Sequence, residues 1–229
     1  MMLDSVLFDL DGLLVDSEPL QFQAYRYAFD QFGIQLTMDD WIRWHSAESS
    51  TARWVESQQL DLDVAQLREV KKRYYDRLIV DELQLKPGAR ELVRDCAQGL
   101  QLAVVSASRR ESIEACLDNF DLGRHFTCYI SGSEVARSKP FPDPYLAGLQ
   151  ALQTTADRAV AVEDSLTGFR SASAAGLTSV VCPDHFIARP ENTFDGADLV
   201  VGSLLELNAS HLRQTHAARH MLATNNSDK

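Results

Sequence analysis

The sequence predicts an α/β fold with a doubly wound, mostly parallel sheet and an inserted all-helical domain. Short apolar runs alternate with amphipathic helical patterns, as they do in proteins with parallel sheets. Residues 16–83 interrupt this alternation, because they hold only helical patterns of apolar residues at i, i+3/i+4 spacing. Polar residues stand where the apolar runs end, which is where open parallel sheets bind ligands.

Six apolar runs are the predicted strands: Ser5–Asp9, Leu102–Ser106, Tyr129–Ser131, Ala159–Val162, Ser179–Val181 and Leu199–Val201. In the helical stretch, aromatic residues recur at helical spacing, which indicates a packed core rather than a cofactor stack. Lys86-Pro87-Gly88 marks the return to the sheet. We therefore expect a core domain of residues 1–15 and 84–229, a helical cap domain of residues 16–83, and a frayed tail after a terminal helix.

The composition is that of an ordinary globular protein. The chain has 229 residues, of which 45% are hydrophobic and 24% charged, and it can bury a large core. Its net charge of -11 and pI near 4.9 disfavour nucleic acid and anionic membranes as partners. No apolar run approaches the ~18 residues of a membrane span, and no signal peptide is recognised.

The four cysteines share no CxxC spacing, so we expect them to be small buried residues in a reducing compartment. These features predict a cytoplasmic protein, monomeric or weakly homo-oligomeric, that acts on a small molecule. Because the chain is acidic, an anionic substrate would have to be met by a local cluster of positive charge or by a metal.

Two carboxylates, Asp9 and Asp11, follow the first predicted strand at i, i+2 spacing. Residues two apart in an extended chain project from the same side, so both acids would face one point beyond the strand. Gly12 lets the chain turn sharply away. Adjacent acids repel unless a cation or a shared proton relieves them. The pair therefore suits a divalent metal and a phosphate, with one carboxylate as nucleophile and the other as proton carrier.

Two further motifs offer phosphate ligands. Ser106 ends the second strand before a predicted helix, and it suits a phosphate ligand and an ordinary helix cap equally well. Lys139 lies in a loop stiffened by Pro140 and Pro142, where it is either aimed at a ligand or a solvated charge.

Two acids, Glu163 and Asp164, follow the fourth predicted strand and precede Ser165. Asp164 and Ser165 suit a helix N-cap, whereas the acids also suit an Mg²⁺ shell completed with Asp9. Each motif has such an ordinary alternative when taken alone. Their joint occurrence, each at a strand end, favours one common site.

Together the motifs resemble those of the haloacid dehalogenase superfamily, through Asp9-x-Asp11-Gly12, Ser106, Lys139-Pro140 and Glu163-Asp164. The resemblance covers essentially the whole chain, and the helical stretch matches that superfamily's small helical cap. It implies that Asp9 is the nucleophile and forms an aspartyl-phosphate, while Asp11 is the acid/base.

The resemblance also implies the ligands. Mg²⁺ would be held by Asp9, by the main-chain carbonyl of Asp11, and by Asp164 with Glu163 nearby. Ser106 and Lys139 would hold the phosphoryl oxygens.

Ser106-Ala107-Ser108 and Ser138-Lys139-Pro140-x-Pro142-Asp143 look like the β-phosphoglucomutase-like branch of sugar-phosphate phosphatases and mutases. The substrate contacts expected in the core are Ser106, Ala107, Ser108, Arg109 and Lys139, with Arg110 as a further candidate. Those expected in the cap are Gln21, Trp44, His45 and Arg53.

The predicted function is therefore Mg²⁺-dependent hydrolysis of small phosphorylated metabolites, namely sugar or polyol monophosphates. Asp11 argues against dehalogenation, which does not require the second aspartate, and the pattern of phosphonate-cleaving relatives is not evident. A β-phosphoglucomutase is the alternative, although its cap histidine falls on Gln21 and no arginine aligns cleanly near His45–Ser50. A phosphoacceptor switch is the non-enzyme alternative, but such receiver domains are shorter and have no helical insert.

Overall fold

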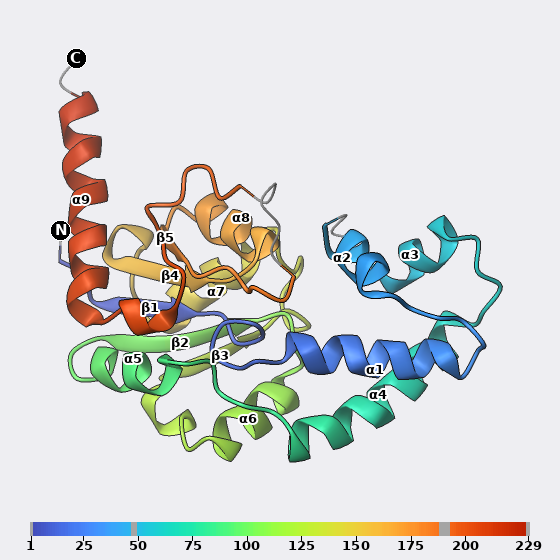
Figure 1. Cartoon of the computed structure of the whole chain (residues 1–229). Coiled ribbons are helices and arrows are strands. Elements are labelled where there is room, and N and C mark those ends of the chain that lie inside the picture. The colour runs from blue at the N-terminus through green and yellow to red at the C-terminus, as the bar shows by residue number, and fades with distance from the viewer. Residues whose placement is uncertain (1, 47–49, 188–192, 228–229) are drawn as a thin grey trace. The chain divides into compact units, whose positions relative to one another are not determined.

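The structure, a computed structural model, describes residues 2–46, 50–187 and 193–227 (Figure 1). The chain divides into two compact units. The first, called the α/β unit below, comprises Met1–Val15, Leu85–Asp184 and Thr193–Lys229, and the second, the helical unit, comprises Asp16–Gln84 and His185–Asn192. The domain boundaries predicted from the sequence stay a prediction. Residues 47–49, where no arginine aligns, and the end of the expected tail lie outside the described residues.

A parallel sheet forms the centre of the α/β unit, with six strands among the described residues. Its order, β3-β2-β1-β4-β5-β6, reverses at β1, so the predicted doubly wound fold is confirmed. Every strand lies within one residue of its predicted run, since strands buried on both faces are near-continuous apolar runs. The strands are β1 (Ser5–Phe8), β2 (Gln101–Ser106), β3 (Cys128–Ser131), β4 (Ala159–Glu163), β5 (Thr178–Val181) and β6 (Leu199–Val200).

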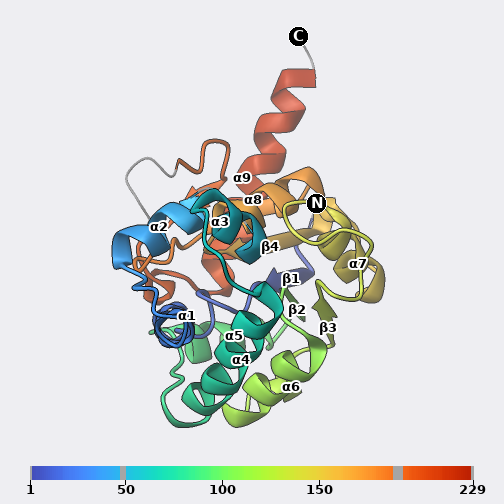
Figure 2. The ribbon, with the colours of Figure 1, turned by 90° about the vertical axis from the view of Figure 1, so that its right-hand side faces the viewer.

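Helices cover both faces of the sheet. Figure 2 shows α7 and α6 on opposite sides of the strands. α7 packs against α8 on one face, and α5 packs against α9 on the other. The helices are α5 (Ala89–Cys96), α6 (Arg110–Asn119), α7 (Asp143–Ala151), α8 (Leu166–Ala174) and α9 (Ala209–Ser227), with short 3₁₀ turns η1 (Gly123–His125), η2 (Ala156–Arg158) and η3 (Leu204–Glu206).

The core beneath α7 and α8 contains Leu7, Val105, Ala161 and Tyr145. Gly148 lets α7 approach this core, because a Cβ there would lie 2.6 Å from Cδ2 of Leu7. Because of this close approach, side chains of α7 pack directly against the strands of the sheet.

The helical unit contains α1 (Glu18–Asp30), α2 (Met38–Ser46), α3 (Thr51–Ser57) and α4 (Val64–Asp81), so the predicted helical insert is confirmed. Pro19 stands in the first turn of α1, and the Asp63 side chain accepts from the first amides of α4. The core of the helical unit is aromatic. The ring centroids of Trp44 and Trp54 are 5.8 Å apart in a stacked pair, and those of Phe186 and Phe22 are 6.0 Å apart.

The cysteines are free thiols; Cys96 is buried and the other three are half-buried. Burial raises the pKa of Cys96 and of Cys116 to about 12, which makes them inert at neutral pH. Within the part of the chain that the structure describes, no helix has both the length and the apolar character needed to cross a bilayer.

Candidate active site

The carboxyl ends of β1, β2 and β4 bring predicted site residues to one edge of the sheet. β1 pairs in register with β2 on one side and with β4 on the other. Asp9, Ser106 and Glu163 stand at these strand ends and therefore emerge close together. The Asp9 amide donates to the carbonyl of Val162 (3.0 Å), which fixes the first acid beside β4. Gly12, with φ of 81°, then turns the chain away.

Lys139 binds two of these acids. Its Nζ donates to Oδ1 of Asp9 (2.5 Å), to Oε1 of Glu163 (2.6 Å) and to the carbonyl of Val105 (2.8 Å). The side chains of Lys139, Asp9 and Glu163 are 7%, 8% and 1% exposed. The ammonium is thus buried and ion-paired rather than solvated, and its three N–H donors each have an acceptor.

Burial and charge shift the pKa values of this pair. Burial raises the pKa of Asp9 to about 7; Glu163 adds to the rise and Lys139 opposes it. Burial alone would lower the pKa of Lys139, but attraction to Asp9 and Glu163 raises it above its usual range. Lys139 therefore stays an ammonium at neutral pH and supplies a fixed positive charge beside Asp9.

Asp11 is held by hydroxyl groups from the end of β2. Its Oδ2 accepts from Ser108 Oγ (2.7 Å) and from Ser106 Oγ (3.2 Å). Ser106 does not cap α6, because the N-cap position belongs to Arg109. The two serines therefore orient the second acid, which leaves the Asp9 carboxylate to Lys139.

Three buried acids form a candidate metal site. Asp9, Glu163 and Asp164 each offer a carboxylate oxygen, and these oxygens lie within 4.8 Å of one another. Such hard oxygen ligands suit Mg²⁺. Three buried carboxylates beside the Lys139 ammonium leave negative charge to be balanced, which a divalent cation would do. The residues present therefore fit the expected metal.

The helix cap after β4 is Ser165 rather than Asp164. The Ser165 side chain accepts from the Gly168 amide at 3.2 Å, so this serine satisfies the start of α8. Asp164 instead lies against Gly12, where a Cβ would come within 2.2 Å of its Oδ2. Gly12, in the turn after β1, thus leaves space for the side chain of Asp164, which follows β4.

Two contacts beside the site were not predicted from the sequence. Tyr145 of α7 donates its hydroxyl to Oε1 of Glu163 at 2.5 Å. Lys86 Nζ donates to Oδ2 of Asp184 at 2.7 Å, and the Asp184 amide lies 3.4 Å from the carbonyl oxygen of Asp164. The sequence could have indicated the Tyr145 contact, because the hydroxyl of a tyrosine on an otherwise apolar helix face usually has a buried hydrogen-bond partner.

The remaining contacts predicted in the α/β unit are arranged differently. Ala107 and Arg109 are exposed on the turn between β2 and α6. Arg110 is engaged within the unit, because its guanidinium donates to both carboxylate oxygens of Glu134 and to the carbonyl of Tyr129. Arg110 is therefore held by residues of its own unit, and the predicted substrate contacts of Arg109 and Arg110 stay predictions.

The residues predicted in the cap lie in the helical unit. Gln21 of α1 accepts from Lys71 of α4, whose ammonium also lies 4.1 Å from the ring centroid of Tyr75. His45 places Nδ1 3.0 Å from the carbonyl of Trp41 and Nε2 3.7 Å from Glu18 Oε2. These contacts anchor the histidine within its own unit.

Two other predicted cap residues differ in exposure. Trp44 is 5% exposed and belongs to the aromatic core of the helical unit, whereas Arg53 is exposed on α3.

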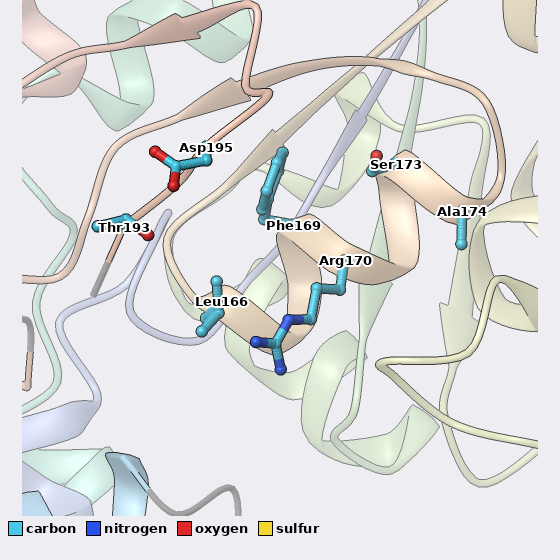
Figure 3. A pocket seen from close by; sticks show the side chains of 7 residues that line it. All are labelled: Leu166, Phe169, Arg170, Ser173, Ala174, Thr193 and Asp195. Atoms are coloured by element: carbon cyan, nitrogen blue, oxygen red, sulfur yellow. The ribbon is translucent and has the colours of Figure 1, made fainter. Parts of the chain in front are cut away.

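A pocket of about 490 Å³ lies along α8 (Figure 3). None of the predicted site residues lines it; its lining is Leu166, Phe169, Arg170, Ser173, Ala174, Thr193 and Asp195. Since no acid pair or buried lysine faces it, this pocket is not the candidate active site.

Comparison with known proteins places these motifs in context. A family model for haloacid dehalogenase-like hydrolases matches residues 6–182. The chain is 32% identical over 219 residues to protein CbbY of Cereibacter sphaeroides, covering 90% of this chain and 94% of that protein. It is 33% identical over 216 residues to hexitol phosphatase B of Escherichia coli, covering 91% and 96%.

A phosphorylated carbohydrates phosphatase of Thermotoga maritima is 30% identical over 183 residues, covering 78% of this chain and 84% of that protein. Among solved structures, a CbbY variant from Rhodobacter sphaeroides in complex with xylulose-1,5-bisphosphate is similar with a TM-score of 0.82. Its sequence is 29% identical, and the match covers 92% of this chain and 99% of that one.

Proposed function

This chain belongs to the haloacid dehalogenase-like hydrolase family, and on that premise we propose that it is an Mg²⁺-dependent phosphatase of small phosphorylated sugars or polyols. The observation that carries the proposal is the buried Lys139 ammonium bridging Asp9 and Glu163 beside Asp164. A fixed cation next to a nucleophilic carboxylate lowers the cost of bringing an anionic phosphate to it.

Asp9 acts as the nucleophile. One of its carboxylate oxygens attacks phosphorus, the bond from phosphorus to the leaving oxygen breaks, and an aspartyl-phosphate forms. Lys139 stabilises the negative charge on the transferred group, which needs positioning and charge more than elaborate covalent chemistry. Oδ1 of Asp9 accepts from Lys139, which helps to orient the carboxylate.

Asp11 carries the proton. It protonates the leaving alkoxide, and it then takes a proton from the water that hydrolyses the aspartyl-phosphate. Its hydrogen bonds from Ser106 and Ser108 hold the carboxyl group in a defined orientation for both steps. Either hydroxyl could donate to a phosphoryl oxygen only by turning its single hydrogen away from Asp11.

Asp9, Glu163 and Asp164 would hold Mg²⁺, with the main-chain carbonyl of Asp11 as a further ligand. The bound cation would supply charge stabilisation for the transferred phosphoryl group.

The substrate class follows from the relatives. Two of them are called phosphatases of hexitols and of phosphorylated carbohydrates, and a third was crystallised with a sugar bisphosphate. In the helical unit, Gln21, a residue predicted to contact substrate, accepts from Lys71. We propose a cytoplasmic, monomeric or weakly oligomeric enzyme whose partner is this small molecule.

The test is phosphate release from a panel of sugar and polyol phosphates with Mg²⁺, alongside p-nitrophenyl phosphate. Many turnovers with inorganic phosphate as product support the proposal. Interconversion of β-glucose 1-phosphate and glucose 6-phosphate in the presence of a bisphosphate would indicate a mutase instead. A single stoichiometric labelling event would indicate a phosphoacceptor switch.

A further inference from the structure

Tyr145 is a buried tyrosine that the proposed reaction does not use. It lies on α7, is 0% exposed, and belongs to the apolar core between α7 and the sheet. Alternation along β4 puts Ala159, Ala161 and Glu163 on the face that α7 covers. The carboxylate of Glu163 therefore points under the helix, where the Tyr145 hydroxyl donates to its Oε1 at 2.5 Å.

The same oxygen also accepts from Lys139. Oε1 of Glu163 receives the Tyr145 hydroxyl and the Lys139 ammonium (2.6 Å), while Oε2 lies 3.3 Å from the Asp164 amide. The glutamate has little room to move, because a Cβ on Gly168 would come within 1.9 Å of Oε2 and 2.3 Å of Oε1. Glu163 therefore cannot follow the lysine if the lysine changes partner.

Lys139 must change partner to bind a phosphate. Its three N–H donors are directed at Asp9, Glu163 and the carbonyl of Val105. A phosphoryl oxygen can accept from this ammonium only if one of those acceptors gives up its bond. Without Tyr145, releasing Glu163 would leave Oε1 of this buried carboxylate without a donor, and such loss is costly.

We propose that Tyr145 is a positioning residue whose hydroxyl keeps Glu163 hydrogen-bonded when Lys139 turns from Glu163 to the phosphoryl group of the substrate. The proposal rests on the proposed function, since it concerns the same lysine. In this pair the Tyr145 hydroxyl is the donor, because a carboxylate oxygen has no hydrogen to give.

Tyr145→Phe tests this with one atom removed. Phenylalanine keeps the ring, whose centroid lies 5.4 Å from the Lys139 ammonium, and loses only the hydroxyl. The matched control is Tyr129→Phe, which removes a hydroxyl that donates to the carbonyl of Gly123 (3.1 Å) at the edge of the sheet. Each variant loses one hydrogen bond, and the melting temperature should fall more for Tyr145→Phe, whose lost bond goes to a buried carboxylate, than for Tyr129→Phe.

The readouts are the Kd of inorganic phosphate with Mg²⁺ present, the KM and kcat for p-nitrophenyl phosphate, and the Kd of Mg²⁺ alone by calorimetry. Tyr145→Phe should raise the phosphate Kd and the KM about tenfold and change kcat less than about threefold, because Lys139 is still present and only the cost of freeing it from Glu163, which falls on binding, increases. Mg²⁺ affinity should change less than about threefold. Tyr129→Phe should match the wild type in all three.

A phosphate Kd for Tyr145→Phe equal to that of Tyr129→Phe, in an enzyme that turns over, would overturn the inference and leave the proposed function standing. A wild-type protein without turnover would instead overturn the proposed function. In a Glu163→Gln background, adding Tyr145→Phe should change the phosphate Kd less than about twofold. A persisting tenfold effect there would show that Tyr145 acts on the lysine directly, and the proposal would be wrong.

Discussion

The α/β unit and the helical unit hold their candidate site residues in different ways. In the α/β unit, the bonds at the site join residues far apart in the chain: Lys139 binds Asp9, and Asp11 accepts from Ser108. In the helical unit, Gln21 also accepts from Lys71 of another helix, but His45 binds the carbonyl of Trp41 within its own helix, and neither bond involves an acid. The strand order of the sheet thus assembles the chemistry, whereas the helical unit offers polar side chains on an aromatic core.

On the proposed function, the α/β unit would carry out the reaction and the helical unit would select the leaving group. Substitutions at the strand ends should reduce turnover of every phosphomonoester, because they act on the transferred group. Substitutions on the helical unit should change which leaving group is accepted. The predictions below test that separation, and they run from the largest expected effect to the smallest.

The largest effect is expected for Asp9→Asn. An amide cannot form the aspartyl-phosphate, so kcat should fall by about 10⁴-fold or more for every substrate. Steady-state phosphate release measures it, with the exposed Asp76→Asn on the helical unit as control. Near-normal turnover by Asp9→Asn would assign the nucleophile elsewhere.

Asp11→Asn should cost about 10²-fold or more in kcat, since it removes proton transfer while leaving the nucleophile in place. Mg²⁺ binding should remain largely intact, because the Asp11 carboxylate is not among the three clustered acids. Calorimetric titration with Mg²⁺ checks this point. Loss of metal binding together with rate would show that Asp11 is a ligand through its side chain.

Lys139→Ala should weaken phosphate binding and lower kcat together, by about 10²-fold in kcat/KM. The substitution removes a charge-assisted contact and leaves two buried carboxylates without their shared partner. Inhibition by inorganic phosphate measures the binding. The control is Lys72→Ala, which changes an exposed lysine. If Lys139→Ala had the same kinetics as this control, Lys139 would have only a structural role.

Lys71→Ala should distinguish substrates. Lys71 lies beside Gln21 in the helical unit, so its loss should raise KM about three- to tenfold for the preferred sugar phosphate and much less for p-nitrophenyl phosphate. The neighbouring Lys72→Ala is again the matched control. An equal effect on both substrates would contradict the separation between the units.

The smallest effect concerns stability of the α/β unit. His216 is 1% exposed and its Nε2 lies 2.9 Å from the carbonyl of Asp157. Burial lowers its pKa, so below the ordinary histidine value the unfolded chain binds more protons than the folded one. Stability should fall as pH drops below about 6.5, lowering the melting temperature by roughly 2–4 °C. His216→Gln should flatten this part of the profile without changing kcat at pH 7.5; an unchanged slope would assign the loss to other groups.

Much of the fold and part of the candidate site could be predicted from the sequence, because both depend on strand ends. Carboxyl ends of neighbouring parallel strands share an edge, so Asp9, Ser106 and Glu163 converge without knowledge of any helix. Lys139 could be proposed for the same edge of the sheet because two prolines stiffen its loop. That its side chain is buried could not be predicted from the sequence.

The remaining contacts of the candidate site depend on side-chain packing, which the spacing of apolar residues in the sequence does not reveal. Tyr145 reads as an ordinary core aromatic until Gly148 brings α7 close to the sheet. Lys86 and Asp184 pair across 98 residues, which no local pattern reveals. The bond of His45 to the carbonyl of Trp41 depends on helix geometry within α2, and its predicted contact with substrate stays a prediction.

The most direct measurement is mass spectrometry of the enzyme quenched in acid during turnover of p-nitrophenyl phosphate with Mg²⁺. If the carboxylate bound by the buried ammonium is the group that receives phosphorus, the phosphorylated peptide will be the one carrying Asp9, modified at that residue. A phosphoryl group found on any other side chain, or steady turnover with none trapped and no burst of released alcohol, would contradict the account.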